Sequence, residues 1–576
     1  MIVTRSKQLP LKHMKQDCFF LYAFLSVAVF LFWKCRYGFG DIDESFYLTI
    51  PYRLIQGDSL FTNEWHLSQM SGVLTLPIVS AFLKITGGTD GIILAIRYIT
   101  TALQCFIALY LYFHLKNMNW LGAVVATLSY MLYIPFGIMA LSYNSMGIMF
   151  LILFILLQFP NKRLPRTSCV ASGLCFAGAV LCCPYLVVVF ALFFLALCII
   201  QSRSNRNKFQ MCTMEELAPL KHALWVTLGA FLAAVAFAIF VLSRATIGDI
   251  LQAFPHILND PEHPPIPLLI NIRHYFGAIA LATGSSIYIY AFIAIVFCIC
   301  FFDKSRKSRR LFYYAIAWIC TIILMVTHYW QIRYINAVLW SINVLGVFIA
   351  LLTDKAIVRQ LFYSFWFTGM LYSLCLHLCS NQRFFAISSA ASVATIGTIM
   401  MIAIFTQELE FAKNNKHFQK LPAMLLLILF GVQLFTQAEL RYSSVFWSNG
   451  MSEQTEYIEN SIQAGLYISE DSAKLYSQKA EDLNALQAYD RDSVLYLSRN
   501  TWYYLMDDSN MASYSAWLAG VSEHTISRLE AYYSLDMNKL PDLVYVDLEH
   551  EDIAYLFAEK FSYNICYDAG GLVLTQ

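Results

Sequence analysis

Three carboxylates stand within four residues, directly after the first long apolar segment of the chain. They are Asp41, Asp43 and Glu44, in the sequence Gly38-Phe-Gly-Asp-Ile-Asp-Glu44. Anionic side chains anchor a chain at a membrane surface poorly compared with Trp, Tyr, Lys and Arg, so anchoring does not explain them. A carboxylate in this place can act as general base toward an acceptor hydroxyl group. The alternative is a capping aspartate with two solvated acids.

A short helix is expected to carry these acids. Apolar residues at Phe46, Ile50 and Leu54 recur at helical spacing and predict one buried face, and Gly57 supplies a helix stop. Asp43 then lies at or near the N-cap, where the positive end of the helix dipole favours its ionised form.

The rest of the chain, which must position this helix, has the composition of a membrane protein. Of its 576 residues, 58% are hydrophobic and 13% are charged, whereas about 25% are charged in an ordinary soluble protein. The formal net charge of +1 excludes a strongly basic nucleic-acid binder, so no nucleic-acid partner is expected. The predicted spans after residue 120 carry no charged residue away from their ends, which weakens the case for an ion-coupled transporter.

Apolar runs suited to membrane helices recur along the first 437 residues. A helix that crosses a hydrocarbon core of about 30 Å needs about 20 mostly apolar residues. Such runs lie near 18–35, 91–113, 120–138, 143–159, 168–184, 185–201, 222–243, 278–302, 311–328, 334–353, 360–378, 385–405 and 421–437. The segment Gly72–Ile85 contains Pro77 and reaches only about 21 Å as a helix, so it is ambiguous.

The distribution of Lys and Arg decides between about 13 and about 14 spans. With 13 spans the cationic connections, such as Lys304–Arg310, lie in the cytoplasm together with the N-terminus, whereas 14 spans would turn that cluster outward. We therefore predict an all-α polytopic bundle of about 13 transmembrane helices in the cell membrane. Gly72–Ile85 then lies against the membrane on the outer face.

The predicted topology divides the chain into a membrane domain, 1–437, with an exterior loop at 36–90, and an exterior C-terminal domain, 438–576. Short β-rich runs alternate with helical stretches in the C-terminal part, which predicts a small α/β domain. The strands are expected at Ser493–Leu497, Leu543–Val546, Ser562–Ile565 and Leu572–Thr575, and the helices around Ser472–Leu486 and Ile526–Ser534.

A Pro-rich segment, Phe254–Pro267, gathers residues that could bind a divalent metal. They are His256, Asp260, Glu262 and His263, but their spacing matches no established metal site, and the prolines disfavour a helix that would align them. No cofactor is therefore expected, with a divalent metal as the alternative. The segment is expected to be a rigid external loop over a substrate cavity.

Several short motifs follow one another across the first 160 residues. After the first span come Asp41-Ile-Asp43-Glu44-x-x-Tyr47, a helix that closes at Gln56-Gly57-Asp58, a Trp65-His66 pair, a Pro-containing segment, Gly87-Gly88, Arg97 at the start of the next span and, later, Tyr143-Asn144-Ser145. This order resembles the polytopic glycosyltransferases of the GT-C superfamily, and within them the protein O-mannosyltransferase and aminoarabinose transferase group. The remaining helices resemble that group only in number and topology.

The resemblance implies transfer of a sugar from a polyprenyl-phosphate carrier to an acceptor on the outer face, with inversion at the anomeric carbon. In that family the Asp of the Asp-Glu pair is the base, and it maps to Asp43; Glu44 would support it, and Asp41 is an extra acid that could replace it. Several relatives place an acid in the second motif, whereas Tyr143-Asn144-Ser145 offers none, which leaves the handling of the acceptor or of a metal open.

A lipid-phosphate donor requires cations, because its leaving phosphate gains charge in the transition state. The first candidate is Arg333, in a short turn rich in aromatic residues, and the second is Arg273 with His274, which opens a span. Each could instead be a snorkelling residue at a helix end. Further candidates for binding donor or substrate are Arg383, His66, Lys84, Tyr143 and Asn144.

The sequence leaves two other functions open. A transporter or flippase of lipid-linked glycans would also need a polytopic bundle and external cations, but it would make no glycosidic bond. A superfamily member without catalysis could act as a binding or scaffold subunit, which the missing second acid allows. The expected partners are a lipid-linked sugar donor and membrane lipids, and the acceptor is not specified.

Overall fold

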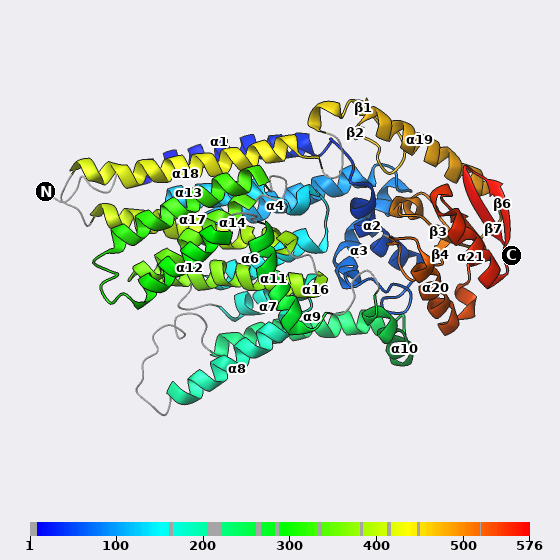
Figure 1. Cartoon of the computed structure of the whole chain (residues 1–576), viewed down its shortest axis with the longest axis horizontal. Coiled ribbons are helices and arrows are strands. Elements are labelled where there is room, and N and C mark those ends of the chain that lie inside the picture. The colour runs from blue at the N-terminus through cyan, green and yellow to red at the C-terminus, as the bar shows by residue number, and fades with distance from the viewer. Residues whose placement is uncertain are drawn as a thin grey trace.

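The computed structural model of the chain describes residues 8–159, 165–204, 220–260, 266–282, 287–331, 337–380, 384–411, 416–445, 450–518 and 520–576. It contains a bundle of apolar helices and, at one end of the bundle, a domain built around a β-sheet (Figure 1). We call the end of the bundle that carries this domain the domain end. Helix α1 begins at the opposite end of the bundle.

A helix is found at every apolar run that the sequence predicts as a span. The helices are α1 (Gln8–Lys34), α4 (Ile92–Leu115), α5 (Trp120–Leu132), α6 (Tyr143–Gln158), α7 (Arg166–Cys182), α8 (Leu186–Ser204), α9 (Leu220–Leu242), α11 (Leu268–Ala282), α12 (Ile287–Phe302), α13 (Arg310–Gln331), α14 (Ala337–Leu352), α15 (Ala356–Leu361), α16 (Thr368–Ser380), α17 (Phe384–Phe411) and α18 (Lys416–Ser443). A π-helical segment, Phe362–Phe367, joins α15 to α16. The last helix continues past residue 437, where the sequence analysis placed the domain boundary.

Seven helical segments of the described part are long and apolar enough to cross a membrane. They are Met14–Lys34, Gln69–Thr86, Ile92–Leu115, His222–Leu242, Arg310–Thr327, Ala356–Cys379 and Ala391–Leu409, and shorter apolar helices accompany them. The chain is a multi-pass membrane protein. Its exact number of spans and its orientation stay predictions, because Gln69–Thr86 also qualifies by length and composition although the charge pattern lays Gly72–Ile85 along the membrane.

Two predicted boundaries differ from the observed helices. The predicted span 120–138 is cut short, since α5 ends at Leu132 and a 3₁₀ turn with Pro135 follows; proline disfavours helical backbone in the residue before it. The predicted loop at Phe254–Pro267 is wrong in its first part, because α10 (Ile247–Leu258) continues through Pro255. A capping box at the start of α10 and the burial of two of its side chains offset the cost of that proline.

The C-terminal domain has a five-stranded sheet in the order β4-β3-β5-β7-β6. Its strands are β3 (Ser493–Leu497), β4 (Asn510–Met511), β5 (Leu543–Val546), β6 (Asn564–Asp568) and β7 (Gly571–Thr575). β3 runs parallel to β4 and β5, and β7 runs antiparallel to β5 and β6. β3 and β5 are apolar along their length because both of their faces are buried, as is usual for parallel strands.

The helices α19 (Glu470–Ala485), α20 (Glu523–Leu535) and α21 (Glu551–Phe561) complete the C-terminal domain. The predicted α/β character, the four predicted strands and the two predicted helices are confirmed, with the third strand starting at Asn564 rather than at Ser562. Three features of the domain were not predicted: α21, β4 and the short hairpin of β1 (Glu456–Tyr457) and β2 (Tyr467–Ile468).

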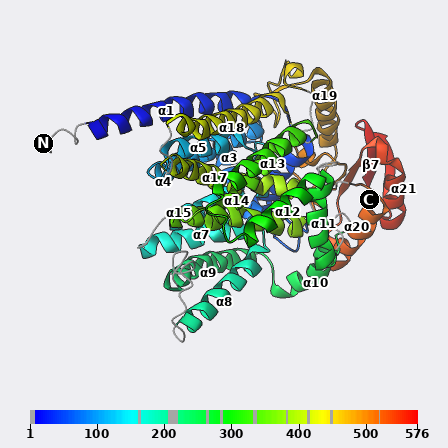
Figure 2. The ribbon, with the colours of Figure 1, turned by 60° about the vertical axis from the view of Figure 1, so that its left-hand side comes forward.

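The domain rests on segments that leave the domain end of the bundle. Helices α2 (Asp41–Gln56) and α3 (Gly72–Thr86) lie between the bundle and the sheet (Figure 1). Figure 2 shows α10 beside α20, where Asp260 accepts a 2.6 Å hydrogen bond from Arg528. Trp65, from the segment between α2 and α3, is fully buried in the core of the C-terminal domain. Bundle and domain therefore share a packed interface.

Candidate active site

The helix that carries the acidic motif forms as predicted. α2 begins at Asp41 with Gly40 as its N-cap, and it ends at Gln56 with Gly57 as its C-cap, whose φ of 118° is left-handed backbone that favours glycine. The predicted apolar face is buried, since Phe46, Ile50 and Leu54 are each at most 2% exposed. Asp43 is the third residue of the helix and is half-buried. Its carboxylate therefore lies in the first turn, at the positive end of the helix dipole.

Glu44 forms a bidentate ion pair with an arginine of α4. Arg97 Nε donates to Glu44 Oε1 and Arg97 Nη2 donates to Glu44 Oε2, each at 2.6 Å. Both side chains are nearly inaccessible to solvent. Arg97 also donates to the carbonyl oxygens of Cys35 at 2.7 Å and Gly38 at 2.9 Å. Glu44 therefore fixes the first turn of α2 to the bundle.

The second sequence motif opens α6. Ser142 and Ser145 form a capping box, in which the Ser145 N–H donates to Ser142 Oγ at 3.1 Å and the Ser142 N–H donates to Ser145 Oγ at 3.0 Å. This cap fixes Tyr143 and Asn144 in the first turn of the helix. The Tyr143 ring lies 6.0 Å from the Tyr47 ring, edge to face. Two motifs that are far apart in the sequence thus meet at the domain end.

The charge of Asp43 acts on both phenols of this pair. Burial first, and the Asp43 carboxylate second, raise the pKa of Tyr47 well above its ordinary value. Tyr47 is therefore a neutral phenol at physiological pH and a hydrogen-bond donor.

Asn144 adds an unused acceptor beside this group. Asn144 is 1% exposed, and its Oδ1 atom has no hydrogen-bond donor within the described ranges. A buried acceptor without a donor is costly, so it favours a ligand hydroxyl or a water molecule at this point.

The C-terminal domain holds the same turn of α2 from the other side. The Thr501 hydroxyl donates to the Ile42 carbonyl oxygen at 2.7 Å and lies 2.6 Å from the Ser45 hydroxyl. Further along α2, the fully buried Arg53 donates to the Ser513 carbonyl oxygen at 2.9 Å. α2 is therefore clamped between the bundle and the C-terminal domain.

The remaining predicted site residues have varied positions. Asp41 begins α2, but its side chain is not described. Arg333 and Arg383 lie outside the described residues altogether. His66 is half-buried against the Phe46 ring at 4.6 Å, and its Nδ1 accepts from the Ser68 N–H at 3.1 Å.

The other three cation candidates lie at helix positions near the domain end. Lys84 is exposed in the last turn of α3, and Arg273 is exposed on α11. His274, next to it, is half-buried, and its Nδ1 has no hydrogen-bond partner in the part of the chain that is described.

The residues considered for metal binding have other contacts. His256 stacks on the Trp65 ring at 5.3 Å, and Asp260 pairs with Arg528. Glu262 and His263 lie outside the described residues. Among the residues that were placed, no group of three or more His, Cys, Asp or Glu side chains could hold a metal ion.

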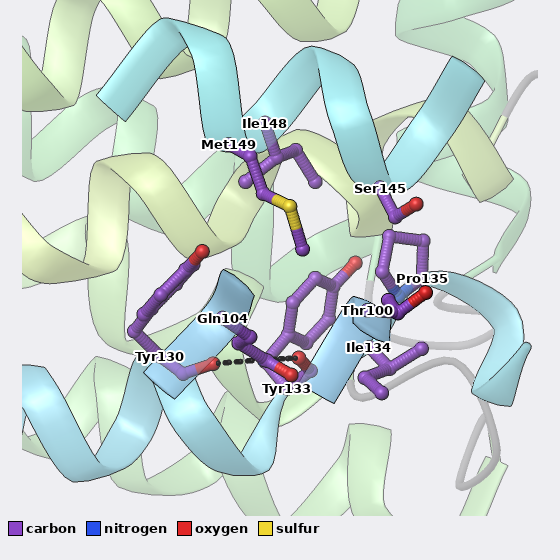
Figure 3. A pocket seen from close by; sticks show the side chains of 9 residues that line it. All are labelled: Thr100, Gln104, Tyr130, Tyr133, Ile134, Pro135, Ser145, Ile148 and Met149. Atoms are coloured by element: carbon purple, nitrogen blue, oxygen red, sulfur yellow. Dashed lines mark hydrogen bonds between the residues drawn. The ribbon is translucent and has the colours of Figure 1, made fainter. Parts of the chain in front are cut away.

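A small cavity of about 20 Å³ lies in the bundle between α4, α5 and α6 (Figure 3). Gln104 and Tyr130 line it, and the Gln104 Oε1 and Tyr130 hydroxyl oxygens are buried without a described partner. The Gln104 amide donates to the carbonyl oxygens of Tyr130, Met131 and Tyr133, where α5 ends. The space is large enough for one water molecule but not for a sugar.

Sequence reasoning missed two residues that position the site. Arg97 was part of the motif but had no assigned role, although an arginine inside an apolar segment is costly unless it is paired. Thr501 gave no signal, because a single threonine in a distant domain has no pattern that links it to α2.

The chain is similar to solved structures of other proteins at low sequence identity. No protein-family model and no curated protein matches the sequence. The chain is similar to ArnT from Cupriavidus metallidurans bound to undecaprenyl phosphate, at 12% identity, over 96% of this chain and 97% of that one, with a TM-score of 0.43. The same protein in the apo state gives 13% identity, 97% and 98% coverage and a TM-score of 0.45. The chain is also similar to the archaeal oligosaccharyltransferase AglB from Archaeoglobus fulgidus in complex with an inhibitory peptide and a dolichol-phosphate. The identity is 11%, the match covers 93% of this chain and 71% of that one, and the TM-score is 0.44.

Proposed function

We propose that the chain is a membrane glycosyltransferase of the GT-C type, which transfers a sugar from a polyprenyl-phosphate carrier to an acceptor hydroxyl on the outer face of the membrane. The observation that carries the proposal is the meeting of two motifs. Tyr47 of the acidic motif packs edge to face against Tyr143 of the second motif, with the ring centroids 6.0 Å apart, and Asp43 precedes Tyr47 by four residues on the same face of α2. The motif resemblance supports the same reaction class.

In this proposal Asp43 is the general base. Its carboxylate takes the proton of the acceptor hydroxyl while that oxygen attacks the anomeric carbon of the sugar. The bond from this carbon to the carrier phosphate breaks on the opposite face, so that the configuration inverts and the phosphate keeps the bonding electrons. Glu44 cannot share this role in the structure described, because both of its oxygens are bound to Arg97.

Other residues of the site are proposed to bind substrate. Tyr47 and Asn144 offer a donor and an unused acceptor for hydroxyl groups of the sugar or acceptor. Cations are proposed to balance the negative charge that develops on the leaving phosphate. We assign this role to members of a set on the predicted outer face, namely Lys84, Arg273, His274, Arg333 and Arg383.

The direct test reconstitutes the full chain in liposomes with polyprenyl phosphates that carry different radiolabelled sugars. We expect label to move from one carrier to an added acceptor extract, and NMR of the product to show the anomeric configuration opposite to that of the donor. A flippase would move intact donor across the bilayer without forming a new glycosidic bond. Donor binding without either outcome would favour a non-catalytic subunit. A product with retained configuration would contradict the proposed single displacement.

Thr501 provides a test of the contact between the C-terminal domain and α2. We expect Thr501→Val to lower kcat about 10-fold with little change in KM, because the first turn of α2 loses a hydrogen bond that sets the position of Asp43. Thr501→Ser keeps the hydroxyl and should retain most of the activity. Thr455→Val, at an exposed threonine of the same domain, is the matched control. Equal losses in the Val and Ser variants would contradict a positioning role for the hydroxyl.

A further inference from the structure

Two cations are buried together where the first and last helices of the bundle end. Lys34 is the last residue of α1 and is 1% exposed, and Arg441 lies in the last turn of α18 and is 7% exposed. The two helices run side by side to the domain end (Figure 1). The charge of Arg441 acts on Lys34, and the charge of Arg97 acts on both.

The hydrogen bonds of the two cations differ. The Lys34 ammonium donates to the Tyr442 carbonyl oxygen at 2.8 Å and lies 3.1 Å from the Met451 sulfur. The Nε and Nη2 atoms of Arg441 are buried, and neither has a hydrogen-bond acceptor among the residues that the structure describes. Arg441 is therefore a buried guanidinium whose N–H groups are not all used.

Within the described ranges, neither Lys34 nor Arg441 forms an ion pair with an acid. The nearby carboxylate, Glu44, gives both of its oxygens to Arg97, so that ion pair is already balanced. Burial of unpaired charge is strongly unfavourable, and the negative ends of the two helix dipoles offset only part of that cost.

We propose that Lys34 and Arg441 form a binding site for a phosphate group. A guanidinium offers a planar fork of donors that matches two phosphate oxygens, and a lysine adds a point charge beside it. The proposal uses neither Asp43 nor Tyr143, so it is independent of the proposed transfer reaction.

The surroundings favour the phosphate of an anionic membrane lipid, whose headgroup carries no cation of its own, over free phosphate. Large apolar side chains of both helices are exposed in the turns that precede the two cations, among them Val29 and Trp33 on α1 and Val432 and Phe435 on α18. Acyl chains can lie along this surface while the headgroup phosphate reaches the cations. Lipid and free phosphate share the chemistry of the site, and the experiment separates them.

The test measures thermal unfolding of the full-length protein under two sets of conditions. In detergent, sodium phosphate is compared with sodium chloride at equal ionic strength. In nanodiscs, phosphatidylcholine alone is compared with phosphatidylcholine that contains phosphatidylglycerol. We expect the midpoint of wild type to rise by about 2 °C or more in at least one comparison, because a ligand that binds only the folded state stabilises it. A rise only in nanodiscs identifies the lipid headgroup, and a rise in detergent identifies the small anion.

Arg441→Gln separates a ligand site from a structural arginine. We expect this variant to lose the response to phosphate or phosphatidylglycerol and, without either, to be as stable as wild type or more so, because an unpaired buried charge has been removed. Arg166→Gln, at an exposed arginine of α7, should keep the full response. No response of wild type in either comparison would overturn the proposal. A uniform destabilisation of Arg441→Gln under all conditions would overturn it as well.

Discussion

Replacement of Asp43 by Asn is expected to lower the rate of the proposed sugar transfer by about 10²–10⁴-fold, the usual contribution of a general base. The amide has nearly the same shape as the carboxylate but cannot accept the acceptor's proton, so donor binding should stay close to that of wild type. Asp43 is half-buried in the first turn of α2, and its removal leaves the ion pair between Glu44 and Arg97 intact. Initial rates in liposomes and the thermal midpoint of the same preparations measure the two quantities.

The matched control for this variant is Asp41→Asn, two residues earlier in the same motif. If Asp43 is the base, Asp41→Asn keeps most of the transfer activity and the double variant is no worse than Asp43→Asn. An inactive Asp41→Asn protein together with an active Asp43→Asn protein would move the role of base to Asp41. Activity in the double variant would remove the motif from the chemistry altogether.

Glu44→Gln should destabilise the protein by about 3–5 kcal/mol, the range for breaking one side of a buried ion pair. The loss arises because the Arg97 guanidinium, nearly inaccessible to solvent, keeps its charge but loses the carboxylate that balances it. Unfolding in detergent, followed by the exposure of buried cysteines to a thiol reagent, gives the change in stability. Transfer activity should fall as well, since the first turn of α2 loses its attachment to α4.

Two controls show whether the burial of the pair is responsible. Glu470→Gln breaks an exposed ion pair with Lys474, in which the side chains are 67% and 70% exposed, and it should leave the stability close to that of wild type because solvent screens the pair. A double variant, Glu44→Gln with Arg97→Gln, should lose less than the sum of the two single variants, because no unpaired charge remains. Additive losses would mean that the two residues do not act as a pair.

Local signals predicted much of the fold. The spacing of Phe46, Ile50 and Leu54 and the glycine that follows α2 gave that helix correctly, since amphipathic periodicity and a left-handed C-cap are local properties. The apolar runs of β3 and β5 were equally clear. The helical course of α10 through Pro255 was missed, because it depends on packing against a distant domain.

The candidate site was only partly predictable. The acidic motif and the Tyr143-Asn144 motif were both identified from the sequence. Their contact could not be predicted from their spacing, because the contact depends on how α2 and α6 pack. Glu44 pairs with Arg97, and the Ile42 carbonyl oxygen accepts a hydrogen bond from Thr501. Single residues so far apart in the sequence leave no periodic signal. The assignment of Asp43 as base and of the cation candidates as phosphate ligands stays a prediction.

The clamp on α2 also fixes when the site can exist during synthesis. Ser45 and Thr501, whose hydroxyls meet at 2.6 Å, are 456 positions apart in the chain. At about 5–20 residues per second a ribosome needs at least about 20 s to reach the second partner after the first. During that interval the first turn of α2 is held only by its contacts with the bundle. A nascent or prematurely terminated chain therefore inserts into the membrane without a complete candidate site, and we expect the proposed transfer to begin only once the C-terminal domain has been made.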